Sequence, residues 1–193
     1  AGVLRTAQQD IKVWSAMDHR RSTMDPTQIN TMHSFEVVGG KKLRGEITPQ
    51  GAKNEALQII SAVLLTSEKV TISNIPDIID VNLLIELLEN MGVSVERPSR
   101  DTCIFQANDI NIDFLHSETF RKKSGRLRGS VMMAGPMLAR FRKAFIPKPG
   151  GDKIGRRRLD THIIGFEKLG ANFSYHAEDG FFHLEAPNLR GTS

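Results

Sequence analysis

The feature that most constrains the fold of this chain is an internal repeat. The same predicted order of elements occurs twice: a long apolar helix, a short strand, a second helix that ends at a glycine, and a hairpin. Leu64 and Leu138 are matching residues 74 positions apart, whereas Gly92 and Gly170 are 78 positions apart. The four extra residues therefore lie in the second copy, between its strand and its second helix. A repeated unit of helices and strands predicts an α/β domain. Its copies span about 52–107 and about 126–186.

The inserted loop of the second copy is rich in glycine and arginine, and it runs from Pro149 to Arg158. Glycines let the backbone approach a ligand closely, and the arginines at its end offer planar donors suited to phosphate or carboxylate. The N-terminus of the helix predicted to begin near Leu159 also favours anions. No Gly-Lys-Ser/Thr ends the segment, which excludes a P-loop. An exposed basic loop without a ligand remains the alternative interpretation.

Polar residues also stand at the start of the first helix in each copy. Lys53 and Asn54 begin the helix of the first copy, and Arg128 lies 74 positions after Asn54. The second-copy helix is predicted over Arg128–Ala139, with a kink at Gly135–Pro136. Neighbouring repeats can bring two such helix starts to one cleft. The alternative is a capped helix start with a solvated lysine.

Charge and composition narrow the possible partners. The 193-residue chain has a net charge of +4 and a pI near 9.4. Its basic residues are clustered, which favours anionic partners such as nucleic acids or phosphorylated metabolites. Aromatic residues make up only 6% and do not alternate with the basic clusters, which argues against single-stranded nucleic acid. No apolar run approaches the roughly 18 residues of a membrane span and no leader peptide is apparent, so a cytoplasmic location is expected.

The cysteine and histidine residues give no indication of a metal site. The single cysteine, Cys103, excludes an internal disulfide and a multi-cysteine metal site. It lies in an apolar predicted strand and is expected to be a buried hydrophobic residue. No zinc-ligand spacing is present, and His162 is interpreted as a hydrogen-bonding residue on its helix. We therefore expect no metal.

The residues before the repeat differ from the rest of the chain. Residues 1–31 are polar with scattered apolar positions, which predicts a loosely ordered extension. Residues 32–51 are a strand segment, with strands predicted at Phe35–Val38 and Leu43–Ile47 on either side of a glycine turn. Residues 52–193 contain the repeat and are predicted to form an α/β domain.

Three separated motifs, taken together, resemble the UDP-N-acetylglucosamine enolpyruvyl transferases. They occur in the same order as in that family, which is far more specific than any one of them, and the resemblance runs from about Phe35 to the end of the chain. The motifs are Gly51–Leu57; Leu127–Ser130 with Gly135–Pro136 and Leu138–Phe141; and Pro149–Gly151 with Ile154–Arg157, Asp160 and His162.

The resemblance implies a fold and an activity. The family moves the enolpyruvyl group of phosphoenolpyruvate onto the 3-hydroxyl of UDP-N-acetylglucosamine and releases phosphate, in the first committed step of peptidoglycan synthesis. It uses no metal or other cofactor. Its fold is an inside-out α/β barrel of two similar domains, each built from three α/β units. By this resemblance the chain holds about two of the three units of the first domain, and the 32–51 segment would pair with the missing C-terminal domain. The chain alone is expected to be inactive.

The resemblance also implies roles for individual residues. Lys53 and Asn54 would contact phosphoenolpyruvate. The sugar nucleotide would be bound by Arg128, Arg157, Arg158, Leu159, Asp160 and Thr161. Most members carry a cysteine that donates a proton to the methylene carbon of phosphoenolpyruvate and is alkylated by fosfomycin, and Asp152 stands at that position here. A carboxylic acid can donate a proton but is a poor nucleophile toward an epoxide, so an active site insensitive to fosfomycin is expected.

Two alternatives remain beside this reading. One is 5-enolpyruvylshikimate 3-phosphate synthase, which shares the fold and the phosphoenolpyruvate chemistry. The Pro-Gly-Gly-Asp loop and Lys53–Asn54 favour the sugar-nucleotide enzyme. The other is a non-catalytic module that uses the same basic loops to bind nucleic acid, with a steep dependence on salt.

Overall fold

The computed structural model describes residues 39–40, 42–147, 158–176 and 180–191. The chain divides into two compact parts, Ala1–Thr48 and Pro49–Ser193. In the first part, the residues Leu43–Ile47 form no strand, and the side chains of Leu43 and Ile47 are 71% and 91% exposed. The strand expected there would pair with a second domain, so it stays a prediction. A strand requires a hydrogen-bonding neighbour, and this segment pairs with none of the described residues. The predicted 1–31 extension and the Phe35–Val38 strand lie outside the described residues.

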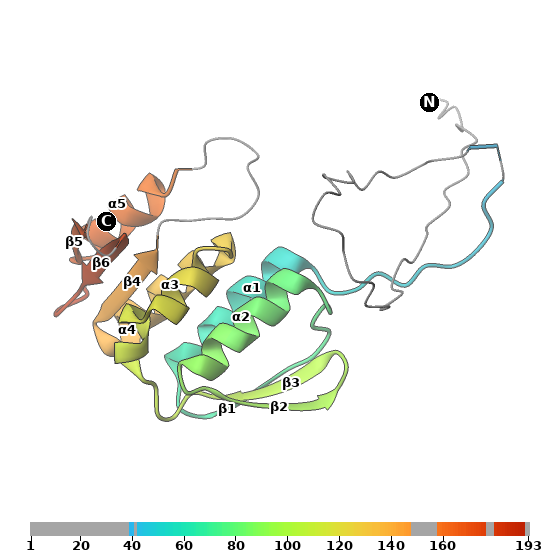
Figure 1. Cartoon of the computed structure of the whole chain (residues 1–193), viewed down its shortest axis with the longest axis horizontal. Coiled ribbons are helices and arrows are strands. Elements are labelled where there is room, and N and C mark those ends of the chain that lie inside the picture. The colour runs from blue at the N-terminus through green and yellow to red at the C-terminus, as the bar shows by residue number, and fades with distance from the viewer. Residues whose placement is uncertain (1–38, 41, 148–157, 177–179, 192–193) are drawn as a thin grey trace, which may run out of the picture. The chain divides into compact units, whose positions relative to one another are not determined.

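The first repeat is a helical pair packed on a small antiparallel sheet (Figure 1). The sheet has the strand order β1-β3-β2, with Val70 opposite Phe105 and Val95 on the other side of Phe105. The helix and strand predictions for this repeat are confirmed. Its elements are α1 (Lys53–Ala62), the 3₁₀ helix η1 (Val63–Leu65), β1 (Lys69–Ile72), α2 (Ile79–Asn90), β2 (Ser94–Ser99) and β3 (Thr102–Gln106).

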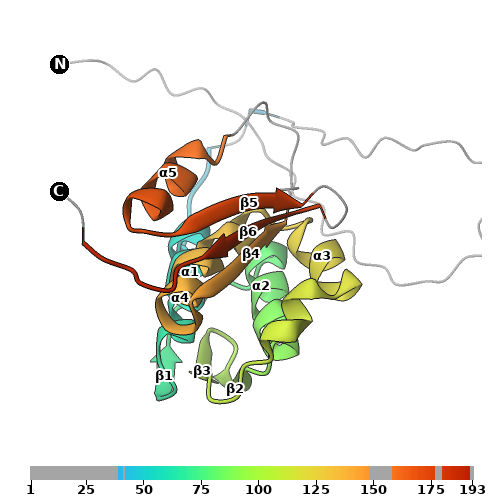
Figure 2. The same cartoon turned by 90° about the vertical axis from the view of Figure 1, so that its left-hand side faces the viewer.

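The second repeat has the same order and the same sheet topology, β4-β6-β5, which confirms a repeated α/β fold (Figure 2). Its elements are the 3₁₀ helix η3 (Arg128–Met133), α4 (Ala134–Phe141), β4 (Lys143–Pro147), α5 (Asp160–Lys168), β5 (Asn172–His176) and β6 (Phe181–Glu185). The described residues contain these two open sheets and no closed barrel.

The similarity of the repeats continues beyond their hairpins. The backbone N–H of Asn111 donates to the Met91 carbonyl at 2.8 Å, and the N–H of Arg190 donates to the Leu169 carbonyl at 3.0 Å. Each acceptor directly precedes a glycine that ends the second helix of its repeat, and that glycine has a positive φ, 101° in the first repeat and 93° in the second. Each repeat therefore closes by returning its chain to the end of its second helix.

The predicted kinked helix at Arg128–Ala139 is instead two helical segments. Residues 128–133 are the 3₁₀ helix η3, and α4 begins at Ala134. Pro136 has no N–H to donate to the carbonyl four residues before it, at Met132, so an α-helical bond is impossible at that place. In the first turn of α4 this missing N–H costs little, because first-turn N–H groups lack helical partners in any case.

The connection between the repeats contains helices that the sequence pattern did not indicate. They are η2 (Ile112–His116) and α3 (Glu118–Ser124). The Ser117 hydroxyl accepts the N–H of Phe120 at 3.0 Å and caps α3, and the buried Phe120 ring stacks on Phe181 of β6. A helix of two turns is too short to show a clear apolar period, which is why it was missed.

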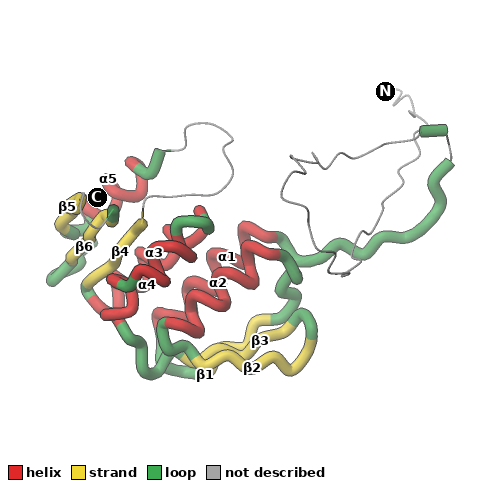
Figure 3. The backbone as a smooth tube through the Cα atoms, viewed as in Figure 1, coloured by secondary structure: helices red, strands yellow, loops and turns green. Residues whose placement is uncertain are grey.

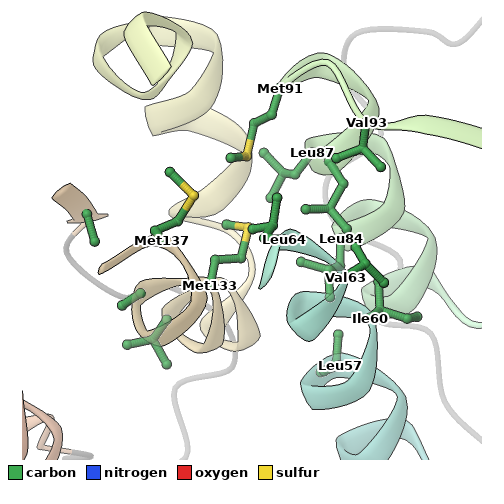
Figure 4. Close-up of a cluster of buried hydrophobic side chains, with 14 of the residues drawn as sticks. Leu57, Ile60, Val63, Leu64, Leu84, Leu87, Met91, Val93, Met133 and Met137 are labelled. Atoms are coloured by element: carbon green, nitrogen blue, oxygen red, sulfur yellow. The ribbon is translucent and has the colours of Figure 1, made fainter. Parts of the chain in front are cut away.

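The core lies where the helices of the two repeats meet (Figure 4). The close-up shows Leu57 and Leu64 from α1 and η1, Leu84 and Leu87 from α2, and Met133 and Met137 from η3 and α4 directed into one cluster. Cys103 of β3 belongs to the same buried set, as predicted. The hairpin formed by β2 and β3 lies beside these helices and leaves its outer face to solvent (Figure 3).

The two second helices differ in burial. α2 buries five apolar side chains, whereas α5 buries none fully and leaves Ile164 half exposed. α2 packs on α1, α3 and η3, while the main partner of α5 is β5. Within the described ranges, no helix is both long and apolar enough to cross a bilayer.

Candidate anion-binding site

Two helical segments lie side by side and run in the same direction. α1 packs against η3, and η1, which continues α1, packs against α4, which continues η3. The first contact is close: a Cβ at Gly129 would lie 2.8 Å from the Leu57 Cδ1 atom. Glycine at this position therefore allows the starts of the two segments to approach each other. The prediction that the repeats bring two helix starts together is consistent with this packing.

Lys53 is the first residue of α1, and its side chain forms an ion pair. The Lys53 Nζ lies 2.8 Å from the Asp80 Oδ2 in the first turn of α2, and the lysine side chain is 48% exposed. Ion pairs this exposed typically contribute about 0–1 kcal/mol, so an anionic ligand can take the place of the carboxylate at small cost. Asn54 follows on the exposed surface. Asp80 was not predicted as part of the site, because the position of α2 relative to α1 is a tertiary property.

The loop before α1 is held by a close backbone contact. A Cβ at Gly51 would lie 2.0 Å from the Asn74 carbonyl oxygen, a distance that no side chain can occupy. Asn74 itself has a φ of 58°, in the left-handed region that asparagine tolerates better than most residues. The turn after β1 therefore fixes the backbone that leads into Lys53.

Arg128 is the first residue of η3 and is partly buried. It is next to Gly129, which contacts Leu57 one turn after Lys53. The N-terminal ends of helical segments carry partial positive charge and free N–H groups. Because the two segments are parallel, their partial positive charges lie at the same end. Lys53 and Arg128 add two full positive charges there. The arrangement therefore suits a ligand that carries negative charge.

The start of α5 carries the other predicted residues of the site. The Arg158 guanidinium forms an ion pair with Asp160, the first residue of α5, and Thr161 is exposed. Leu159 differs, because its side chain is buried and its carbonyl accepts the N–H groups of His162 and Ile163. A ligand can therefore reach Leu159 only through its backbone. Asp152 and Arg157 lie outside the described residues.

The described residues offer no metal site and no reactive thiol. No group of three or more His, Cys, Asp or Glu side chains among them could hold a metal ion. Burial raises the pKa of the Cys103 thiol, which keeps it in the less reactive protonated form.

Comparison with known proteins identifies the family. The family model described as EPSP synthase (3-phosphoshikimate 1-carboxyvinyltransferase) matches residues 37–193. The chain belongs to the EPSP synthase family. The match includes α1, η3 and α5, and thus every residue predicted for the site.

Several curated relatives of this member of the EPSP synthase family share the same name. A protein of Porphyromonas gingivalis named UDP-N-acetylglucosamine 1-carboxyvinyltransferase is 59% identical over 161 residues. A protein of the same name from Bacteroides fragilis is 57% identical over 162 residues, and one from Bradyrhizobium diazoefficiens is 44% identical over 157. These matches cover 83%, 84% and 81% of this chain but only 37%, 37% and 35% of the relatives. The chain thus spans little more than a third of their length.

A solved structure shares the fold. The crystal structure of the enolpyruvyl transferase NikO from Streptomyces tendae aligns with a TM-score of 0.60 at 22% identity. The alignment covers 78% of this chain and 32% of that one. At this identity the likeness concerns the fold alone.

Proposed function

We propose that the protein containing this chain transfers the enolpyruvyl group of phosphoenolpyruvate to the 3-hydroxyl of UDP-N-acetylglucosamine and releases phosphate. This reaction is the first committed step of peptidoglycan synthesis. The observation that carries the proposal is the parallel pair of helical segments, with Lys53 and Asn54 at the start of one and Arg128 at the start of the other. The names of the relatives supply the substrate class.

The charges of the site match those of both proposed substrates. Phosphoenolpyruvate carries a phosphate and a carboxylate, and UDP-N-acetylglucosamine carries a diphosphate. In the proposal, Lys53 leaves Asp80 and binds phosphoenolpyruvate together with Asn54. Arg128 and the residues at the start of α5 bind the sugar nucleotide. Fixed cations of this kind stabilise the negative charge that develops in the transition state.

The chemistry needs a proton donor. Adding a proton to the methylene carbon of phosphoenolpyruvate makes its second carbon electrophilic, and the sugar hydroxyl can then bond to that carbon. Because the product keeps the carbon–carbon double bond, one proton must leave the new methyl group as phosphate departs. We assign the donor role to Asp152, whose carboxyl group must be protonated for this step.

The remainder of the proposed active site would come from residues outside this sequence. The chain spans about 37% of the length of its most similar curated relatives. We therefore propose that a further, C-terminal domain supplies the other wall of the site and the general base. The partners of this chain are then that domain and the two small anionic substrates.

A phosphate-release assay tests the proposed function. The full reading frame that contains this sequence is expressed, and phosphate release from phosphoenolpyruvate is measured with and without UDP-N-acetylglucosamine. Release that requires this acceptor is expected. A folded protein that releases no phosphate with it would contradict the proposal.

A second candidate function has its own supporting observation. The matching family model is described as EPSP synthase (3-phosphoshikimate 1-carboxyvinyltransferase). Shikimate 3-phosphate is therefore tested as acceptor in the same assay. The identities of 57–59% to relatives named for UDP-N-acetylglucosamine favour the sugar nucleotide. Release only with shikimate 3-phosphate would reverse that choice.

A further inference from the structure

We propose that Arg140 is a positioning residue that holds the two repeats in register and so sets the spacing between Lys53, Asn54 and Arg128. The role in spacing rests on the proposed function, whereas the contact itself is a structural observation. Arg140 belongs to one of the basic clusters that first suggested anionic partners. In the structure its guanidinium is instead directed at the protein backbone.

The Nη1 atom of Arg140 donates to carbonyl groups of the first repeat. The acceptors are the carbonyl oxygens of Leu64 at 3.1 Å, Thr66 at 3.0 Å and Ala107 at 2.8 Å. They lie at the end of the α1–η1 segment and just after β3, whereas Arg140 lies on α4 in the second repeat. One cation therefore joins two elements of the first repeat to a helix of the second.

These acceptors are suited to a cation. The last carbonyls of a helical segment lack helical partners and carry partial negative charge. Hydrogen bonds from a charged donor are about twice as strong as those between neutral groups. The centroid of the Phe141 ring lies 4.9 Å from the Arg140 Cζ, so the ring covers one side of the guanidinium. Arg140 thus caps the C-terminal end of the α1–η1 segment from the neighbouring repeat.

The Arg140 contact lies at the opposite end of the helical pair from Lys53 and Arg128. The two parallel segments touch at their starts through Gly129 and Leu57, and at their ends through Arg140. Specific contacts at both ends of a packed helical pair restrict sliding and rotation of one segment against the other. Loss of the Arg140 contact should therefore change the spacing between Lys53 and Arg128 at the opposite end.

Kinetics of the full reading frame test the role in positioning. The variants are Arg140→Met, which keeps most of the stem, Arg140→Lys, which keeps the charge, and Arg100→Met as a matched control at an exposed ion pair with Asp77. Because small displacements of binding groups can cost up to about 100-fold in rate, we expect Arg140→Met to lower kcat/KM about tenfold or more. Arg140→Lys should restore most of it, and Arg100→Met should match the wild type. A folded Arg140→Met with wild-type kcat and KM but a lower Tm would overturn the proposal.

Hydrogen exchange gives a readout that needs no turnover. The amides of Ala56 and Ser130 lie at the starts of the two segments and are hydrogen-bonded to Ala52 and Leu127. We expect both to exchange severalfold faster in Arg140→Met than in Arg100→Met. Unchanged exchange at these amides would overturn the proposed role of Arg140, whether or not the wild type is active. A lack of activity in the wild type would by itself contradict only the proposed function. If Arg140→Met does not fold, Arg140→Gln decides by the same comparison.

Discussion

At the residue scale, Arg142 has a backbone conformation that favours glycine. It follows α4 with a φ of 64° and a ψ of 4°, and its N–H donates to the Leu138 carbonyl. Its own carbonyl accepts the N–H of Ala186, so the conformation is fixed by the strand pairing that follows. The left-handed region is strained for a residue with a Cβ but not for glycine.

Arg142→Gly should therefore stabilise the protein. We expect the free energy of unfolding to rise by about 0.5–1 kcal/mol, since relief of strain exceeds the added entropy of the unfolded chain. Urea denaturation measures it. Arg126→Gly is the control, because Arg126 is exposed and is not among the residues with positive φ. A loss of stability in Arg142→Gly equal to that of the control would contradict this account.

Asp152 should decide the response to fosfomycin. A carboxyl group attacks an epoxide far more slowly than a thiolate does, so the enzyme made from the full reading frame should keep its activity after incubation with the drug. The Asp152→Cys variant, if active, should lose activity with time under the same conditions. Rapid irreversible inactivation of the wild type would show that Asp152 does not confer insensitivity.

At the scale of elements, a glycine at a helix contact and a hydrogen-bonded carboxylate fix how helices pack against each other and against a hairpin. Gly129 allows η3 to contact α1, whereas Gly135 in α4 has open space around its Cβ position. Asp77, just before α2, accepts hydrogen bonds from Asn82 at 3.0 Å and from Arg100 at the tip of the hairpin. Both features join elements that are distant in the sequence.

Gly129→Ala should push the two segments apart. The new methyl group would lie 2.8 Å from the Leu57 Cδ1, and overpacking of this kind costs about 1–3 kcal/mol. In a double-mutant cycle, Leu57→Val should recover part of the loss. Gly135→Ala is the matched control and should be neutral or stabilising, because alanine favours helix more than glycine does. Equal destabilisation by both glycine substitutions would argue against the close contact.

The contribution of Asp77 to stability should depend on pH. Hydrogen bonds from Asn82, and then from Arg100, hold the pKa of Asp77 below its ordinary value of 3.8. A carboxyl group with a lowered pKa stabilises the folded state above its unfolded pKa, and this contribution disappears as the pH falls through the folded pKa. The stability difference between wild type and Asp77→Asn should therefore be constant from neutral pH down to about pH 4 and shrink below 3.8. Urea denaturation at several pH values measures it, and a difference that grows in acid would contradict the link.

At the scale of the whole molecule, the two repeats form one core but only part of the proposed active site. Lys53, Asn54 and Arg128 begin parallel segments, while the α5 start lies on a helix that packs mainly on β5. α5 also leaves Ile164 half exposed and Leu169 partly exposed. These apolar positions are consistent with a fold that continues beyond the described elements.

The isolated 193-residue chain should therefore show no catalytic turnover. We expect no acceptor-dependent phosphate release from the chain alone, and release from the full reading frame under the same conditions, because the proposed second wall and base are absent from the shorter protein. Matched protein concentrations and circular dichroism spectra provide the control. Turnover by the isolated chain would contradict the assignment of essential groups to a further domain.

The sequence by itself determined the local elements and the repeat. Apolar periods of about 3.6 residues and of 2 residues predicted the helices and the strands, and positive-φ glycines ended α2 and α5 as expected, because these features depend on neighbouring residues. The motifs around Lys53, Arg128 and Asp152 were enough to indicate the family. Local patterns do not identify pairing partners, and the strand expected at Leu43–Ile47, which forms no pair among the described residues, stays a prediction.

Only the tertiary structure decided how distant residues interact. Asp80 beside Lys53 and the Arg140 guanidinium on three carbonyl groups join positions 27 to 76 residues apart. A local pattern does not specify such contacts, because each depends on the packing angle and register between helices. The same basic residue type thus faces solvent at Arg100 and caps a neighbouring helical segment at Arg140. Packing, rather than residue type, decides which arginine is available to a ligand.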